Sequence, residues 1–234
     1  ESHPVFSPDA TAIAFTSDRE SEDADVYLMN TDRSGKAKRL TAWATNETVE
    51  PGCWSPDGTR IAFFSDNKDK NDDIFVMSAE VFRPQKLPVE NKYNSGFASV
   101  SPDGKQILFQ ADTENKTGEI RIFDLETKRE KVLAQTENAD PLPVFSPDGK
   151  QIAFQSKVEG NTEICLINAD GSGFVNLSNN PAKHVSPAWS PDGTRIVFAS
   201  NRDGNFALFQ LYAMNADGSN QHRIYSSGGI SGSP

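Results

Sequence analysis

The sequence predicts an all-β fold built from five copies of one four-stranded unit. Three observations predict it: the tetrapeptide Ser-Pro-Asp-Gly or a close variant recurs five times, β-branched and aromatic runs follow each copy in register, and no segment has a long helical period. The copies begin at Ser7, Ser55, Ser101, Ser146 and Ser190, in steps of 48, 46, 45 and 44 residues. We therefore expect one domain over 1–234, with approximate repeats at 1–48, 49–94, 95–139, 140–183 and 184–234.

Each repeat contains the same series of elements. A short apolar stretch precedes the tetrapeptide, and a strand such as TRIAFFS (59–65) follows it. A polar loop, a second long strand such as DIFVM (73–77), a polar turn and a short strand such as RPQKL (83–87) complete the unit. Runs of alternating β-branched and aromatic residues are typical of strands, so the count is four strands per repeat.

The recurring aspartate is predicted to be a turn residue and not a catalytic acid. Proline sets φ for the turn, aspartate accepts bonds from nearby backbone, and glycine adopts the positive φ of a tight hairpin. In the first copy Ala10 replaces the glycine, so we expect either a strained left-handed residue or a different turn there. Asp170 and Asp217, in two copies of Asn-Ala-Asp-Gly-Ser, are expected to be structural in the same way. The predicted turn residues of the main motif are Asp9, Asp57, Gly58, Asp103, Gly104, Asp148, Gly149, Asp192 and Gly193.

Composition narrows the possible partners. The 33 acidic and 23 basic side chains give a formal charge of −10, which disfavours nucleic acid and anionic membrane surfaces. No window approaches the roughly 20 apolar residues of a membrane span, and the first residues lack the pattern of a signal peptide. Cys53 and Cys165 lie in apolar strand patterns, so we expect free thiols without a chemical role.

The repeated phrase resembles a known family. The pattern SPDG-T/K-R/Q-I-A-F, followed by D-I-Y/F-x-M-N and DGS, is similar to the TolB-type β-propeller repeat, a relative of the WD-repeat blade. The resemblance implies a β-propeller of four-stranded blades and a periplasmic or secreted location. The α/β domain that precedes the propeller in TolB itself has no counterpart in this sequence. Propellers of this type occur in scaffold proteins, in peptidases and in secreted proteins, so the resemblance does not define a function.

Blade number follows from the phase of the repeat. TolB-type propellers generally resemble six-bladed rings, whereas this sequence holds five periods. Pro4, Pro143 and Pro187 stand three residues before their tetrapeptides, and Pro234 has the same phase. We expect a closed five-bladed ring, because exposed edges favour aggregation. The alternative is a fragment or a partner-completed six-bladed ring.

The mouth of the central channel is the predicted binding site. Residues just before each tetrapeptide start the innermost strand, which places His3, Glu50, Asp140 and His184 at the mouth. Trp43, Tyr93 and Phe97 are large groups in the variable links and complete the candidate set. The alternatives are that Trp43 and Phe97 pack over the blades and that His184 is an ordinary loop side chain.

Two acidic loops raise the question of calcium. Asp18, Asp23, Asp66 and Asp72 are the candidate ligands, but neither loop has the ligand spacing of an EF-hand and both contain basic residues. We therefore expect solvated loops, with no cofactor beyond weakly bound calcium.

Catalytic motifs are scarce in the sequence. It contains no G-x-S-x-G elbow, no H-E-x-x-H and no phosphate-binding glycine loop. We expect a non-enzymatic scaffold that binds a protein, peptide or glycan. The alternatives are an enzyme that acts on polysaccharide, with His3, Glu50, Asp140 and His184 converging from different blades, or a substrate-gating cap domain of a larger hydrolase.

Overall fold

A computed structural model describes residues 2–20, 24–41, 49–66, 72–81, 83–89, 95–114, 117–137, 140–204 and 209–224. The chain divides into two compact units, residues 1–114 with 121–131 and residues 115–120 with 132–234. Regular structure in the described ranges consists of strands, and no helix in them is long and apolar enough to cross a membrane.

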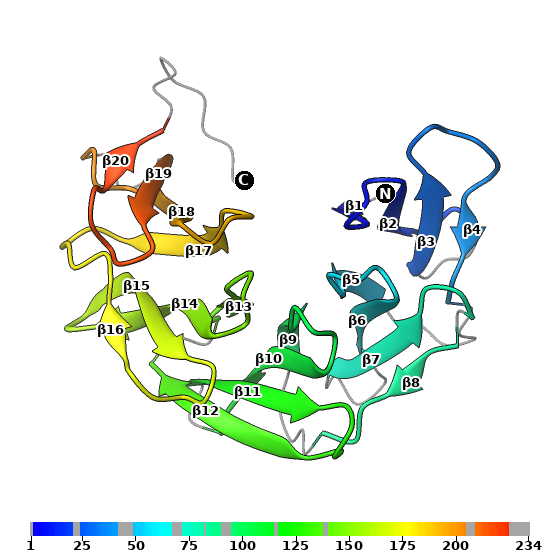
Figure 1. Ribbon diagram of the computed structural model, residues 1–234, viewed down its shortest axis with the longest axis horizontal. Helices are drawn as coiled ribbons and strands as arrows, with labels where there is room; N and C mark the ends of the chain where they lie inside the picture. The colour runs from blue at the N-terminus through cyan, green and yellow to red at the C-terminus, as the bar shows by residue number, and fades with distance from the viewer. Residues whose placement is uncertain are drawn as a thin grey trace. The chain divides into compact units, whose positions relative to one another are not determined.

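Within the described ranges, twenty strands form five four-stranded sheets, the blades of a β-propeller (Figure 1). Blade 1 contains β1 (Ser2–Phe6), β2 (Ala12–Ser17), β3 (Asp25–Asn30) and β4 (Lys38–Arg39). Blade 2 contains β5 (Val49–Trp54), β6 (Arg60–Asp66), β7 (Asp72–Ser78) and β8 (Gln85–Lys86). Blade 3 contains β9 (Ser95–Val100), β10 (Gln106–Asp112), β11 (Gly118–Asp124) and β12 (Glu130–Thr136). Blade 4 contains β13 (Val144–Phe145), β14 (Gln151–Val158), β15 (Asn161–Asn168) and β16 (Val175–Asn176), and blade 5 contains β17 (His184–Trp189), β18 (Arg195–Ser200), β19 (Gln210–Asn215) and β20 (His222–Arg223).

Every blade is an antiparallel meander in which strands pair in chain order. The pairs are in equivalent register: Trp54 lies opposite Ile61 in blade 2, and Trp189 lies opposite Ile196 in blade 5. The predicted all-β propeller with five four-stranded blades is therefore confirmed. The closure of the ring stays a prediction.

The Ser-Pro-Asp-Gly segment forms a hydrogen-bonded turn in which the aspartate accepts bonds from its own neighbours. In the second copy the Ser55 hydroxyl donates to Asp57 Oδ1, which also accepts from the Thr59 backbone N–H at 3.0 Å and its hydroxyl at 2.8 Å. These bonds lower the pKa of the Asp57 carboxyl, because they favour its charged form. The N–H of Gly58 donates to the Ser55 carbonyl, and Gly58 has φ of 71°. The same aspartate–serine bond occurs in all five copies.

In the first copy, Ala10 adopts the left-handed conformation and the turn is unchanged. It has φ of 56°, and its N–H donates to the Ser7 carbonyl at 2.8 Å, as the glycines do in the other copies. The turn is thus the same, and alanine occupies a left-handed conformation that a Cβ disfavours.

The second hairpin, Asp-Gly-Ser, requires glycine for a different reason. Gly171 and Gly218 have φ of 90° and 84°, and a Cβ on them would lie 2.8 Å from the Leu133 carbonyl oxygen and 2.9 Å from the Leu177 carbonyl oxygen. The hairpin therefore packs against the outer strand of the preceding blade. Asp170 and Asp217 accept the N–H groups of Ser172 and Ser219, so their predicted structural role is confirmed.

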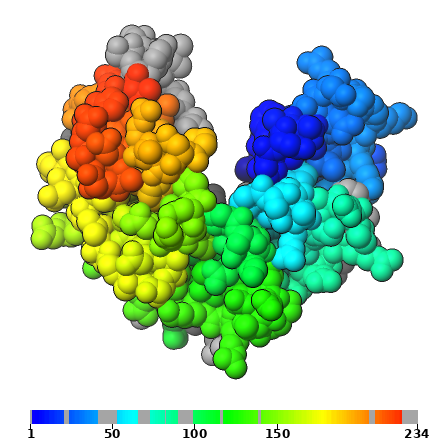
Figure 2. All heavy atoms as spheres, viewed as in Figure 1, coloured from blue at the N-terminus to red at the C-terminus, as the bar shows by residue number. Residues whose placement is uncertain are grey.

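Within each unit, neighbouring blades pack face against face. We call the face toward the following blade the trailing face and the opposite one the leading face. Ala14, Val26 and Leu40 on the trailing face of blade 1 pack with Ile61, Phe63 and Met77 on the leading face of blade 2. The same arrangement joins blade 2 to blade 3 and blade 4 to blade 5. Figure 2 shows blades 4 and 5, coloured from yellow-green to red, packed directly against each other within the second unit.

The two cysteines are free thiols, as predicted. Cys165 is buried in blade 4, and burial raises the pKa of its thiol to about 12. Cys53 is half-buried and its Sγ accepts the Val100 N–H at 3.2 Å. Both serve as small packing groups between strands.

The effect of a substitution at the turn glycine on the free energy of unfolding should depend on how well the new residue tolerates a left-handed φ. Gly104→Val is expected to lower the free energy of unfolding by about 1–3 kcal/mol, because a β-branched residue at φ of 71° is strained. Gly104→Ala should cost less, and Ala10→Gly should stabilise by about 1 kcal/mol. Asp57→Asn should be tolerated, because an amide oxygen can still accept the same donors. Chemical denaturation of the four variants measures these differences, and a stable Gly104→Val protein would contradict the assignment.

Candidate functional site

The starts of the innermost strands carry the predicted binding residues, and the structure places three of them. His3 lies in β1 with an exposed side chain, and Asp140 is exposed just before β13. His184 begins β17 but its side chain is fully buried. Trp43 and Tyr93 lie outside the described residues. Glu50 in β5 and Phe97 in β9 have described backbones, but their side chains lie outside the described part.

The inner strands of three blades share an unusual backbone. His3, Leu142 and Ser186 have φ of 52°, 45° and 56°, and each directly precedes a proline. In β1 and β17 the strand register shifts at this point, which is the signature of a β-bulge. Left-handed conformations cost energy for residues other than glycine, so their recurrence at one position marks a constrained part of the fold.

Gln155 connects two of these strand starts. It comes from β14 and is buried, and its Nε2 donates to the Asp140 carbonyl at 2.6 Å while its Oε1 accepts the Ser186 N–H at 2.9 Å. One amide side chain therefore holds the entry of blade 4 and the bulge of blade 5 in place. Sequence reasoning missed this residue, although a glutamine within the apolar run QIAFQS is a signal that such a run contains a specific polar contact.

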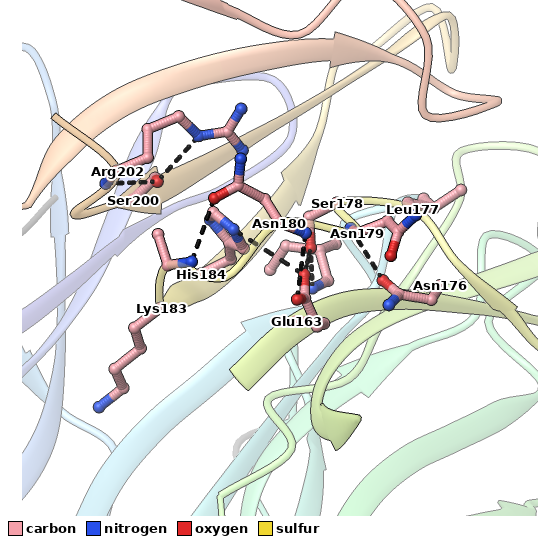
Figure 3. Close-up of polar contacts among 12 residues, drawn as sticks. Glu163, Asn176, Leu177, Ser178, Asn179, Asn180, Lys183, His184, Ser200 and Arg202 are labelled. Carbon is pink, nitrogen blue, oxygen red and sulfur yellow. Dashed lines mark hydrogen bonds and ion pairs between the residues drawn. The ribbon is translucent and has the colours of Figure 1, made fainter. Parts of the chain in front are cut away.

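A second polar group lies at the junction of blades 4 and 5 (Figure 3). Glu163, in β15, is buried, and its carboxylate accepts the Ser178 hydroxyl and the Asn180 N–H, the latter at 3.2 Å. Ser178 Oγ in turn accepts the Ile164 N–H at 2.9 Å. Burial raises the pKa of the Glu163 carboxyl, and the two hydrogen bonds oppose that rise.

His184 lies beside this carboxylate. Its Nε2 is 3.8 Å from Glu163 Oε2, and its ring packs edge-on against Phe198 with centroids 5.6 Å apart. Neither ring nitrogen makes a well-formed hydrogen bond in the described part of the chain. Burial, assisted by the Arg202 guanidinium, lowers the pKa of His184 to about 4, so the ring is neutral at pH 7.

Arg202 completes the group labelled in Figure 3. Its backbone N–H and Nε both donate to Ser200 Oγ at 3.2 Å, and its guanidinium lies 4.5 Å from the Tyr212 ring centroid. Arg19 repeats this arrangement in blade 1, where it bonds to Ser17 and lies 5.0 Å from the Tyr27 ring centroid. A cation over an aromatic face is favourable, and its recurrence indicates a structural role. Sequence reasoning missed both arginines, although Ser-Asp-Arg and Ser-Asn-Arg follow the same strand.

The acid–hydroxyl pair also recurs outside blade 4. In blade 1, Thr41 Oγ1 donates to Asp25 Oδ1 at 2.8 Å and accepts the Val26 N–H at 3.0 Å, and Arg39 forms an ion pair with Asp25. A repeated arrangement of this kind ties the outer strand to the third strand. His184 and Glu163, with relative exposures of 0% and 3%, form a pair that the fold covers at the junction of blades 4 and 5.

The calcium candidates are only partly placed. Asp18 is exposed after β2. Asp23 lies outside the described residues, and the side chains of Asp66 and Asp72 are not described. Within the described ranges, no group of three or more His, Cys, Asp or Glu side chains is arranged to hold a metal ion.

Comparison with protein families agrees with the blade architecture. A model of the TolB β-propeller domain, PD40, matches residues 1–141 and 111–234. The chain belongs to the TolB β-propeller domain family. A search of curated proteins found no match to this TolB-type propeller.

Solved structures with the same fold have diverse functions. A protein described as a putative TolB from Agrobacterium tumefaciens superposes with a TM-score of 0.75 and 22% identity, over 95% of this chain and 79% of that one. TolB from Acinetobacter baumannii has a TM-score of 0.73 and 24% identity, over 94% of this chain and 53% of that one. An oligogalacturonate lyase from Vibrio parahaemolyticus has a TM-score of 0.73 and 18% identity, over 94% of this chain and 63% of that one. At these identities the likeness shows the fold alone, and the propeller spans little more than half of the Acinetobacter protein.

The sealed histidine predicts a pH-dependent stability. An unfolded chain protonates His184 near pH 6.5, whereas the folded chain does so near pH 4. Between these values the unfolded state binds more protons, so the free energy of unfolding should fall as pH falls, by about 3 kcal/mol from this residue. Glu163, with its raised pKa, acts in the opposite direction. Denaturant melts from pH 7.5 to 4 should show a shallower decline in His184→Gln than in the parent chain, whereas His222→Gln, at an exposed histidine, should follow the parent.

Proposed function

We propose that this TolB-type propeller is a non-enzymatic scaffold that binds a segment of a protein partner at the starts of its innermost strands. The observation that carries the proposal is the left-handed residue before a proline, which recurs at His3 in the first unit and at Leu142 and Ser186 in the second. In the first unit this geometry presents the His3 ring, and in the second it presents the Leu142 aliphatic chain and the Ser186 hydroxyl. Repeat folds form binding surfaces in this way, with a fixed frame and variable side chains.

The bulge also favours a polypeptide as the ligand. A bulge re-aims the side chain of its extra residue, so this side chain can contact an extended partner segment. His3 is exposed, and Leu142 and Ser186 are half-buried. The formal charge of −10 supports a partner segment with net positive charge, because opposite charges speed association.

The sealed Glu163–His184 pair supports a role without catalysis. General acid–base catalysis needs its groups within hydrogen-bond reach of the substrate, and these two side chains are covered by the fold. The turn aspartates are likewise bonded to their own backbone, as Asp192 illustrates: the Ser190 hydroxyl and the Thr194 N–H lower its pKa to about 2. The acidic groups described above therefore serve the structure.

The location and excluded partners form part of the same proposal. Resemblance to TolB supports a periplasmic or secreted protein, and the acidic net charge argues against nucleic acid. Because solved relatives with this fold include a lyase and peptidases, the activity of any larger protein that contains this propeller is a separate question.

Binding to defined probes tests the proposal. The purified chain is applied to an array of ten-residue peptides of graded charge and to an array of neutral and acidic oligosaccharides. We expect binding to basic peptides, weakened about tenfold or more by His3→Ala. His222→Ala is the matched control, because His222 is an exposed histidine on an outermost strand. The same protein is incubated with oligogalacturonate and Mn²⁺.

The alternative outcomes separate the other functions. Release of unsaturated uronate products would show that the protein is a lyase and that the proposed scaffold function is wrong. Binding of oligosaccharides alone would make the ligand a glycan. If His3→Ala and His222→Ala weaken peptide binding equally, the binding site does not lie at the inner strands.

A further inference from the structure

Gln155 makes three hydrogen bonds to the starts of the innermost strands in the second unit. Its backbone N–H donates to the Pro141 carbonyl at 2.8 Å, and its Nε2 donates to the Asp140 carbonyl at 2.6 Å. Its Oε1 accepts the Ser186 N–H at 2.9 Å. Gln155 is only 8% exposed, so these bonds are largely shielded from water, where an unpaired backbone group is costly.

The inner strand of blade 4 is shorter than those of the other blades. β13 contains two residues, Val144 and Phe145, whereas β1, β5, β9 and β17 contain five or six. The segment 140–143 therefore lies before the paired strand, and Gln155 bonds to the carbonyl groups of its first two residues. Gln155 thus contributes to the path by which the chain enters blade 4.

Two residues at these strand starts have a strained backbone. Leu142 and Ser186 have φ of 45° and 56°, and each precedes a proline. A residue before proline favours an extended conformation, and a left-handed φ costs energy for residues other than glycine. Such a conformation persists where the surrounding structure holds it. The Gln155 amide bonds directly to Ser186 and to Asp140, two residues before Leu142.

The four-stranded repeat does not itself require an amide at this position. Gln155 follows the buried Phe154 of β14. The equivalent residues of blades 1, 2, 3 and 5 are Thr16, Phe64, Gln110 and Ala199. The side chains of Phe64 and Ala199 cannot form such hydrogen bonds, yet blades 2 and 5 are the same antiparallel meander. The contacts of Gln155 are therefore specific to the strand starts of blades 4 and 5.

We propose that Gln155 is a positioning residue of the peptide-binding site: it holds Ser186 and the segment 140–142 in the geometry that a partner segment recognises. This inference rests on the proposed function and assigns part of its site to blades 4 and 5. Preorganisation lowers the entropy cost of binding, so loss of these hydrogen bonds should weaken binding even where the direct contacts with the partner are unchanged. Gln155 is buried and acts through the residues that it holds.

Gln155→Met tests this role, because methionine keeps the length of the side chain and lacks the amide. The intact chain and the variant are compared by hydrogen exchange of the Ser186 amide and by dissociation of the ten-residue basic peptide that binds the parent most tightly. We expect exchange and dissociation to be faster by about tenfold or more, with little change in the association rate. Gln151→Met, at the opposite end of β14, is the matched control and should keep both rates within about twofold of the parent.

Ser186→Gly provides a second test, which also applies if Gln155→Met folds poorly. Glycine adopts a positive φ readily, so it should keep the left-handed conformation with less support from Gln155. The decrease in the free energy of unfolding caused by Gln155→Met should therefore be smaller in the Ser186→Gly background than in the parent chain. Chemical denaturation of the parent, the two single variants and the double variant measures this coupling.

Three results would overturn the proposal, and they can be told apart. If Gln155→Met speeds exchange at Ser186 and lowers stability but leaves peptide dissociation unchanged, Gln155 has a structural role only. If exchange at Ser186 is unchanged, or the effects of the two substitutions on stability are additive, Gln155 does not hold the left-handed residue. A parent chain that binds none of the peptides would show that the proposed function is wrong, and the positioning role would be rejected with it.

Discussion

The packing of one sheet face on the next is the interaction on which the rest of this structure depends. A four-stranded blade has two apolar faces and is stable only when neighbours cover them. Small residues on the trailing faces allow the sheets to approach: Ala14 packs in the same cluster as Phe63, and Ala153 in the same cluster as Phe198. Small side chains on one face that meet large ones on the next allow close packing of the sheets.

Polar contacts align the blades that this packing holds together. The buried acid at the start of the third strand accepts a hydroxyl from the end of the fourth, as Glu163 does from Ser178 and Asp25 from Thr41. The same hydroxyl accepts a backbone N–H, which leaves fewer buried groups unpaired. Gln155 bonds to both inner-strand starts of blades 4 and 5. These ionisable and amide groups thus contribute to the fold.

Particular residues show how far the sequence could predict the candidate site. The turn aspartates were predictable, because their bonds involve residues two or three positions away and the motif repeats. His184 was predictable as a strand-start residue but not as a sealed one, since its burial depends on Phe198 and Glu163, which lie on other strands. Gln155 and Arg202 were not singled out, because their partners are distant in sequence or are aromatic faces that no spacing reveals.

The sequence by itself determined the all-β class, the count of five repeats, the two glycine hairpins and the free cysteines. These features arise from local backbone preferences and from a period that recurs along the chain, and both can be read without knowing any long-range contact. The tertiary structure decided which polar side chains are buried and where left-handed residues precede the prolines. Those properties depend on neighbours contributed by other strands and blades, and burial is a property of the packed sheets and not of any one segment.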